Sequence, residues 1–157
     1  MTTHRALAAL ALALLAAACG PKRFPGTEIP DNDDTRGVVQ ALERYRDALQ
    51  RRDAGAVLAL ASPDYFDNGG TPDPADDLDR AGLEVQLPRD LKGLEGYRVQ
   101  FTLRRVDVVK DAATAEVFFE QYYRVKTPNG EVPRRDADVH RFGLVRTQRG
   151  WLFASGL

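Results

Sequence analysis

Residues 113–125 read ATAEVFFEQYYRV, and this stretch decides the fold class. Its side chains alternate with a period of two, which is the pattern of a β-strand that buries one face. The expected buried face holds Ala113, Ala115, Val117, Phe119, Gln121, Tyr123 and Val125, while the opposite face holds Thr114, Glu116, Glu120 and Arg124. The stretch therefore predicts a long strand that packs on a hydrophobic core.

The alternation continues on both sides of this strand. Upstream, it runs through residues 97–108 and slips only at Arg104 and Arg105, which predicts a β-bulge. Downstream, we expect a third strand at about Asp138–Thr147 and a last one at Trp151–Ser155. The strands are joined by short turns, at residues 110–111, 127–130 and 148–150. Strands connected in this way form an antiparallel sheet.

Two helices are expected before the sheet. Asp34 or Thr35 caps the first, which ends near Arg52. Asp53 caps a shorter second helix over residues 54–61. The first helix carries an apolar stripe at helical spacing, formed by Val38, Leu42, Tyr45 and Leu49. Its stripe predicts a helix that packs against the sheet.

The segment between the helices and the sheet is less regular. Residues 64–70 predict a short strand and a glycine turn. Residues 71–96 have leucines at helical spacing, but Gly82 and Pro88 predict a broken helix rather than a continuous one.

This element order resembles the nuclear transport factor 2-like fold, which also includes ketosteroid-isomerase-like and polyketide-cyclase-like proteins. The resemblance covers residues 35–157 and rests on three local features: the helix pair that ends in Asp64-Tyr65-Phe66, the bulged first long strand, and the terminal Gly150-Trp151. It implies an α+β fold in which a curved antiparallel sheet wraps around N-terminal helices to form a cone with a pocket. None of these features is a catalytic motif, so the resemblance implies little about activity.

The N-terminus predicts export. Arg5 precedes an apolar stretch that is too short to span a bilayer, and small residues then lead to Cys19-Gly20. This arrangement resembles the lipobox of bacterial lipoproteins, although Ala16 stands where that family prefers leucine. The resemblance implies a signal peptide at residues 1–18, a lipidated Cys19 with a flexible tether at residues 19–34, and a folded domain at residues 35–157. The alternative is an ordinary signal peptide followed by a free cysteine.

Lipidation of Cys19 would determine where in the cell the protein lies. Two or three acyl chains, such as palmitate, would hold the chain at a bacterial membrane on its periplasmic or cell-surface side. Gly20 after the cysteine favours the outer membrane by resemblance to the sorting rule of enteric bacteria. The formal net charge is −1, which gives no electrostatic reason to expect nucleic acid as a partner.

The sequence contains few candidates for chemistry. Asp67 could act as the base of an isomerase, but Asn68-Gly69-Gly70 follows it, so a turn-forming aspartate explains it equally well. His140 is the only histidine after residue 18, and a core or rim position is its simpler interpretation. We expect no metal and no cofactor, because the chain lacks a set of histidine and cysteine ligands. The Asp31–Asp34 cluster does not match a calcium-binding loop.

We therefore expect a membrane-anchored protein that binds a small apolar ligand or an envelope protein without catalysis. The residues expected to line its pocket are Tyr45, Tyr65, Gln121, Tyr123 and His140. One alternative is an isomerase or dehydratase of the ketosteroid-isomerase-like class that uses Asp67 or His140. Another is a homodimer formed through the outer face of the sheet.

Overall fold

The structure, a computed structural model, describes residues 22–157, so Cys19 and the predicted signal peptide lie outside the described residues. In chain order its elements are α2 (Asp33–Gln50), α3 (Ala54–Leu60), β1 (Phe66–Asp67), the 3-10 turn η1 (Pro74–Asp76), β2 (Leu78–Asp79), α4 (Arg80–Lys92), β3 (Glu95–Val109), β4 (Ala112–Thr127), β5 (Gly130–Thr147) and β6 (Gly150–Ser155). No helix within this range is both long and apolar enough to cross a membrane.

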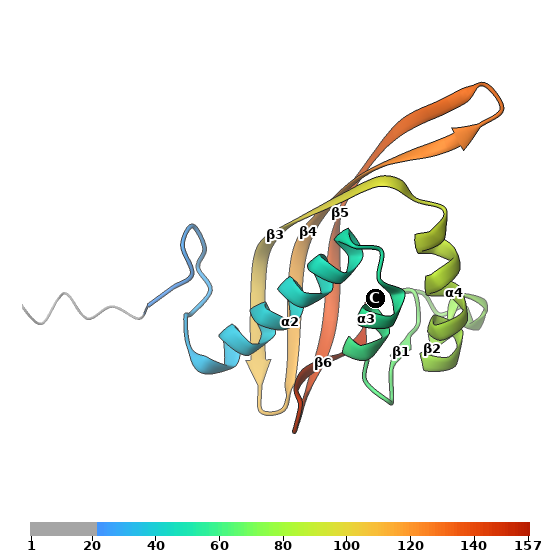
Figure 1. The fold of residues 1–157 in the computed structure, drawn as a ribbon. Coiled ribbons are helices and arrows are strands. Elements are labelled where there is room, and N and C mark those ends of the chain that lie inside the picture. Colours follow the sequence, from blue (N-terminus) through green and yellow to red (C-terminus); the bar gives the residue numbers. More distant parts are fainter. Residues whose placement is uncertain (1–21) are drawn as a thin grey trace, which may run out of the picture.

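The long strands form a four-stranded antiparallel sheet in the order β3-β4-β5-β6. The sheet is curved, and α2 lies across one of its faces, with α3 and α4 beside it (Figure 1). We call the face that α2 covers the inner face and the opposite one the outer face. β1 and β2 form a separate two-stranded sheet, and β1 contacts β6. The predicted α+β architecture is confirmed.

The period-two alternation of residues 113–125 in β4 determines which of their side chains reach the core. Ala115 and Val117 are fully buried, and Phe119 is 5% exposed. The predicted bulge is present, because the register between β3 and β4 shifts between Leu103 and Arg105.

Aromatic rings fill the space between α2 and the inner face. The ring of Tyr45 lies 5.8 Å from Phe101, 5.6 Å from Phe142 and 5.3 Å from Phe153, measured between ring centroids. Phe101 in turn lies 4.9 Å from Phe119. Clusters of this kind stabilise a core beyond the area that they bury.

β5 is longer than the sequence predicted. It begins at Gly130 rather than at Asp138, and residues 130–137 pair with β4 throughout. The sequence pattern assigned no strand to residues 131–137, which include Pro133 among charged side chains, and β6 pairs with only residues 143–147 of β5. The other edge of residues 130–142 is therefore open within the described chain, and an open edge accommodates proline and charge.

α4 is continuous, so the prediction of a broken helix is wrong. Gly82 lies in the first turn, where its N–H donates to the N-cap carboxylate of Asp79 at 2.8 Å. Pro88 cannot donate to the carbonyl of Glu84, but both residues are exposed, so water can satisfy that carbonyl.

The residues before α2 pack against the domain. Ile29 is 3% exposed and belongs to the main core, and Phe24 packs against the same cluster. A bridge between Arg23 and Pro30 closes this segment into a loop. The N-cap of α2 is Asn32, with Thr35 as the third residue of a capping box, rather than Asp34 or Thr35 as cap. The packed part of the chain therefore begins before residue 35. The sequence did not indicate this, because a single apolar residue such as Ile29 produces no periodic pattern.

Candidate functional site

Two of the predicted pocket residues lie inside the core. Tyr45 is 6% exposed within the aromatic cluster, and burial raises the pKa of its hydroxyl. Tyr65 is 2% exposed, and its hydroxyl donates to the carbonyl of Leu157 at 3.3 Å and accepts from the Leu157 N–H at 3.1 Å. Burial, followed by the negative charge of Asp67, raises the pKa of Tyr65 to about 12. Both tyrosines act as structural residues here.

The other three predicted residues share the inner face of β4 and β5. The hydroxyl of Tyr97 donates to Oε1 of Gln121 at 3.2 Å, so a protein group satisfies this amide oxygen. The hydroxyl of Tyr123 donates to Oδ2 of Asp136 at 2.7 Å. The Asp136 contact could not be foreseen, because the strand predicted for this part of the chain began only at about Asp138.

His140 stacks on Phe119, with 4.5 Å between ring centroids and 14° between ring planes. Burial lowers the pKa of His140, and the charge of Asp138 acts in the opposite direction. A half-buried histidine with a lowered pKa is neutral at physiological pH, and His140 packs against the rings of Phe119 and Phe142 at the edge of the core.

Asp67 lies at the opposite side of the sheet from His140. Its Oδ1 accepts the N–H of Gly69 at 3.0 Å, and its Oδ2 accepts the N–H of Gly156 at 2.6 Å. The first bond is the turn that the sequence predicted, and the second ties β1 to the residue that follows β6. Both carboxylate oxygens therefore hold backbone in place.

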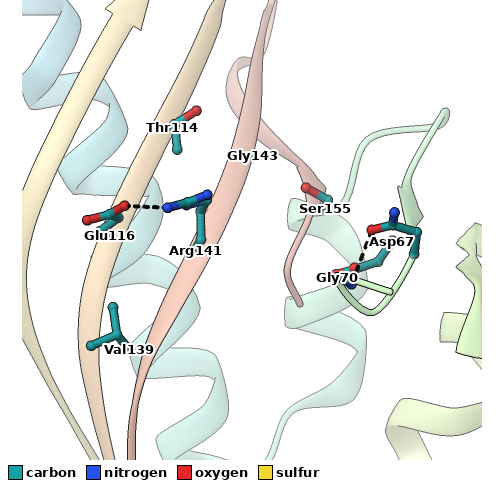
Figure 2. Close-up of a pocket in the computed structure, with 9 residues that line it drawn as sticks. Asp67, Gly70, Thr114, Glu116, Val139, Arg141, Gly143 and Ser155 are labelled. Atoms are coloured by element: carbon teal, nitrogen blue, oxygen red, sulfur yellow. Dashed lines mark hydrogen bonds and ion pairs between the residues drawn. The ribbon is translucent and has the colours of Figure 1, made fainter. Parts of the chain in front are cut away.

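Asp67 also borders a cavity of about 530 Å³ on the outer face. We call this the outer cavity. It is lined by Asp67, Asn68, Gly70, Thr114, Glu116, Val139, Arg141, Gly143 and Ser155. Figure 2 shows that β4 and β5 form one side of it, while Ser155 and the loop after β1 form the other.

Strand register explains why these side chains meet. Thr114 pairs with Gly143, and Glu116 pairs with Arg141, so all four positions share the outer face. Gly143 leaves this face open beside β6, since a Cβ there would lie 2.7 Å from Oγ of Ser155. A glycine inside a strand often marks such a close approach.

The cavity contains one ion pair and the further negative charge of Asp67, whose carboxylate oxygens accept backbone N–H groups. Nη2 of Arg141 donates to Oε1 of Glu116 at 2.8 Å across the strands (Figure 2). The lining also contains the hydroxyl groups of Thr114 and Ser155 and the side-chain amide of Asn68. Among the residues that line the cavity, no histidine lies beside Ser155.

Within residues 22–157, no group of three or more histidine, cysteine, aspartate or glutamate residues is placed to hold a metal ion. Sequence reasoning identified only Asp67 among the residues that line the outer cavity. Thr114 and Glu116 were assigned to the strand face opposite the core, Asn68 and Gly70 to a turn, and only the tertiary position of the loop after β1 brings these residues together around a cavity.

Comparison with known proteins supports the fold. No protein-family model and no curated protein sequence matches the chain. Among solved structures, it resembles a proposed dehydratase of the nuclear transport factor 2-like family from Streptomyces avermitilis, with 19% identity over 78% of this chain and 92% of that chain and a TM-score of 0.60. A ketosteroid isomerase-like protein from Erwinia carotovora gives 20% identity over 79% and 93%, with a TM-score of 0.64.

A proposed aromatic ring hydroxylase from Novosphingobium aromaticivorans is similar at the same level, with 15% identity over 78% and 85% of the two chains and a TM-score of 0.65. Sequence identities this low carry the architecture and not the activity. The curved sheet, the helix on its inner face and these similarities together show that residues 22–157 have the nuclear transport factor 2-like fold.

Proposed function

We propose that this chain is a non-enzymatic binding domain, held at a bacterial membrane through Cys19, that takes a small polar ligand into the outer cavity. The observation that carries the proposal is the cavity itself. Its 530 Å³ lies within the range of small-molecule pockets, which is roughly 300–1,000 Å³.

The lining favours a neutral or zwitterionic ligand with several hydroxyl or amino groups. Glu116 and Arg141 already pair with one another at 2.8 Å, so neither charge is free to compensate a charged ligand, and the carboxylate of Asp67 disfavours an anion. Hydroxyl and amide groups from Thr114, Asn68 and Ser155 can exchange hydrogen bonds with such a ligand. The expected apolar ligand fits the inner face less well, because the rings around Tyr45 occupy that space.

Filling the cavity tests this proposal. In the full chain carrying Cys19→Ser, neutral monosaccharides and zwitterionic amino acids are screened for a rise in thermal midpoint. A compound that binds the outer cavity should stabilise this protein but not its Gly143→Val variant, whose new side chain would displace Ser155 at the edge of the cavity. Gly93→Val is the matched control, because a Cβ at Gly93 meets nothing within 4 Å. Equal stabilisation of both valine variants would place the binding elsewhere.

The membrane anchor rests on sequence alone. Cys19 is the only cysteine and directly follows an apolar run and small residues. Cys19→Ser should move the protein from the membrane to the soluble fraction, and mass spectrometry should find acyl chains on the N-terminus of the unsubstituted protein. Membrane association that persists with an unmodified N-terminus would rule out the anchor.

The alternative is an isomerase or dehydratase. It is motivated by the names of two similar structures, the proposed dehydratase and the ketosteroid isomerase-like protein. Asp67 and His140 cannot form one site, however, since His140 lies on the inner face and Asp67 borders the outer one. If a turnover is found, replacing each residue by alanine decides whether either one supports it. Unchanged turnover in both variants would exclude these two residues.

A homodimer through the outer face is a separate proposal. Val139 is 42% exposed there, and the guanidinium of Arg104 lies 5.0 Å from the ring of Phe118. Sedimentation of the Cys19→Ser chain should then show a dimer that Val139→Asp dissociates, whereas a monomer at all concentrations would exclude it.

A further inference from the structure

The outer cavity has an uneven charge. Its lining contains two carboxylates, those of Asp67 and Glu116, and one guanidinium, that of Arg141. Nη2 of Arg141 already donates to Oε1 of Glu116 at 2.8 Å, so this pair is neutral as a unit. Within residues 22–157, Asp67 bonds to backbone N–H groups and forms no ion pair. The lining therefore carries an excess negative charge, which lies across the cavity from the ion pair (Figure 2).

Two backbone groups hold the carboxylate of Asp67 in place. Its Oδ1 accepts the N–H of Gly69 and its Oδ2 accepts the N–H of Gly156, so both oxygens are held. A carboxylate has about four acceptor positions, and these two bonds use only part of that capacity. A group that is already held in position loses little freedom when a ligand donates to it.

A second carboxylate lies beside the same wall. Asn68 and Gly70 line the cavity, and a Cβ at Gly69 between them would lie 2.7 Å from Oδ2 of Asp76. Asp76 accepts a hydroxyl hydrogen bond and forms no ion pair in the described part of the chain. Residues 64–79 contain six aspartates and no lysine, arginine or histidine. No side chain of this segment can therefore neutralise the wall.

Carboxylates on the neighbouring strands are compensated. On the same outer face, Glu120 accepts from Nη2 of Arg135 at 2.6 Å. Asp107 accepts from Nε of Arg105 at 2.5 Å. Pairing of opposite charges is favourable where they share an exposed sheet face. Asp67 differs, because the chain supplies it with backbone donors but with no positive charge, which a ligand could supply.

We propose that the outer cavity binds a hydroxylated amine in its ammonium form, with the ammonium group against the carboxylate of Asp67. The inference rests on the proposed function and adds a positively charged class to the neutral and zwitterionic ligands of that proposal. An ammonium group donates three hydrogen bonds and accepts none, which matches the open acceptor positions of a carboxylate. The hydroxyl groups of such a ligand can bond with Thr114, Asn68 and Ser155.

The test uses the full chain carrying Cys19→Ser and two sugars of nearly the same shape, glucosamine and glucose, in calorimetric titrations. At about pH 6 an amine is protonated and an aspartate is ionised, so glucosamine should bind about tenfold more tightly than glucose. Asp67→Asn keeps the size of the side chain and removes its charge, so it should reduce this preference to less than about twofold. Glu131→Gln is the matched control and should leave the preference unchanged. Glu131 lies roughly 33 Å from Arg141 along β5, at about 3.3 Å per residue, where salt screens its charge.

A second measurement needs no substitution. At about pH 9 the amine of glucosamine is largely deprotonated, so its affinity should fall towards that of glucose, which has no group that titrates in this range. This comparison keeps the inference testable if Asp67→Asn loses its backbone bonds and does not fold, which circular dichroism would show.

Three results would count against the inference, and they differ in what they leave intact. Equal affinity for the two sugars, lost in Gly143→Val, would overturn the inference and leave the proposed function standing. A preference for glucosamine that persists in folded Asp67→Asn, or at about pH 9, would overturn it as well. If neither sugar binds, the proposed function and the inference fail together.

Discussion

The hydroxyl of Tyr65 forms two hydrogen bonds with the backbone of Leu157, although 92 positions separate these residues in the sequence. One hydroxyl thus satisfies both polar backbone groups of a residue that follows the last strand. Together with the bond from Gly156 to Asp67, it holds the segment after β6 against β1.

Tyr65→Phe should lower the free energy of unfolding by about 1–3 kcal/mol, because it leaves a backbone donor and acceptor without their partner. Urea denaturation measures this loss. Tyr122→Phe is the matched control, since its half-exposed hydroxyl makes only a 3.4 Å contact with Glu120. Equal losses in the two variants would mean that the Leu157 bonds contribute nothing specific.

Alkaline pH should destabilise the protein through its buried tyrosines. Burial is the main cause that raises the pKa of both Tyr65 and Tyr97 to about 12, from an ordinary value of 10.0. Between pH 10 and 12 the unfolded chain loses these protons while the folded one keeps them, so stability falls as pH rises through that window. Urea denaturation across this range should show the decline, and it should be shallower in Tyr65→Phe. A pH-independent free energy of unfolding would contradict the assignment.

Gln50 should stabilise the edge of the sheet. Its Nε2 donates to the carbonyl of Tyr97 at 2.9 Å and its Oε1 accepts from the N–H of Val99 at 3.0 Å, so one side chain of α2 caps two backbone groups of β3. Gln50→Ala should cost about 1 kcal/mol and speed hydrogen exchange at the Val99 amide. Gln40→Ala, an exposed position on the same helix, should do neither. Unchanged exchange at Val99 would show that the Gln50 bonds do not persist in solution.

Ile29 should contribute to stability as a core residue. Ile29→Ala should lower the free energy of unfolding by about 2–5 kcal/mol, the usual cost of truncating a buried isoleucine. Glu28→Ala, whose side chain is 86% exposed, should have little effect. If both variants unfold at the same urea concentration as the parent chain, residues 22–31 do not pack as described.

Elements whose pattern is local were predicted well. The period-two alternation located β3, β4 and β6, the slip at Arg104 located the bulge, and the stripe of α2 located the core side of that helix. These signals come from burial of one face, which leaves its period in the sequence.

Elements that depend on distant parts of the chain were missed. The part of β5 before Asp138, which contains Pro133, was missed because the sequence cannot show that one edge of β5 is open there. Pro88 suggested a break because its exposure on α4 is a tertiary property. The outer cavity depends on Gly143 lying beside Ser155, a pairing of two strands that no local pattern encodes.

The length of β3 has a consequence for how the molecule stands on a surface. Residues around Pro30 lie beside Val106–Val109 at one end of this strand, whereas Arg98 and the far part of the β4–β5 hairpin lie at the other. Fifteen residues of strand span at most about 50 Å at about 3.3 Å each. For a chain held at its N-terminus, the length of β3 would set the distance between the membrane and this hairpin. The hairpin would then lie well beyond the layer of counterions that covers a charged bilayer, which extends only about 10 Å.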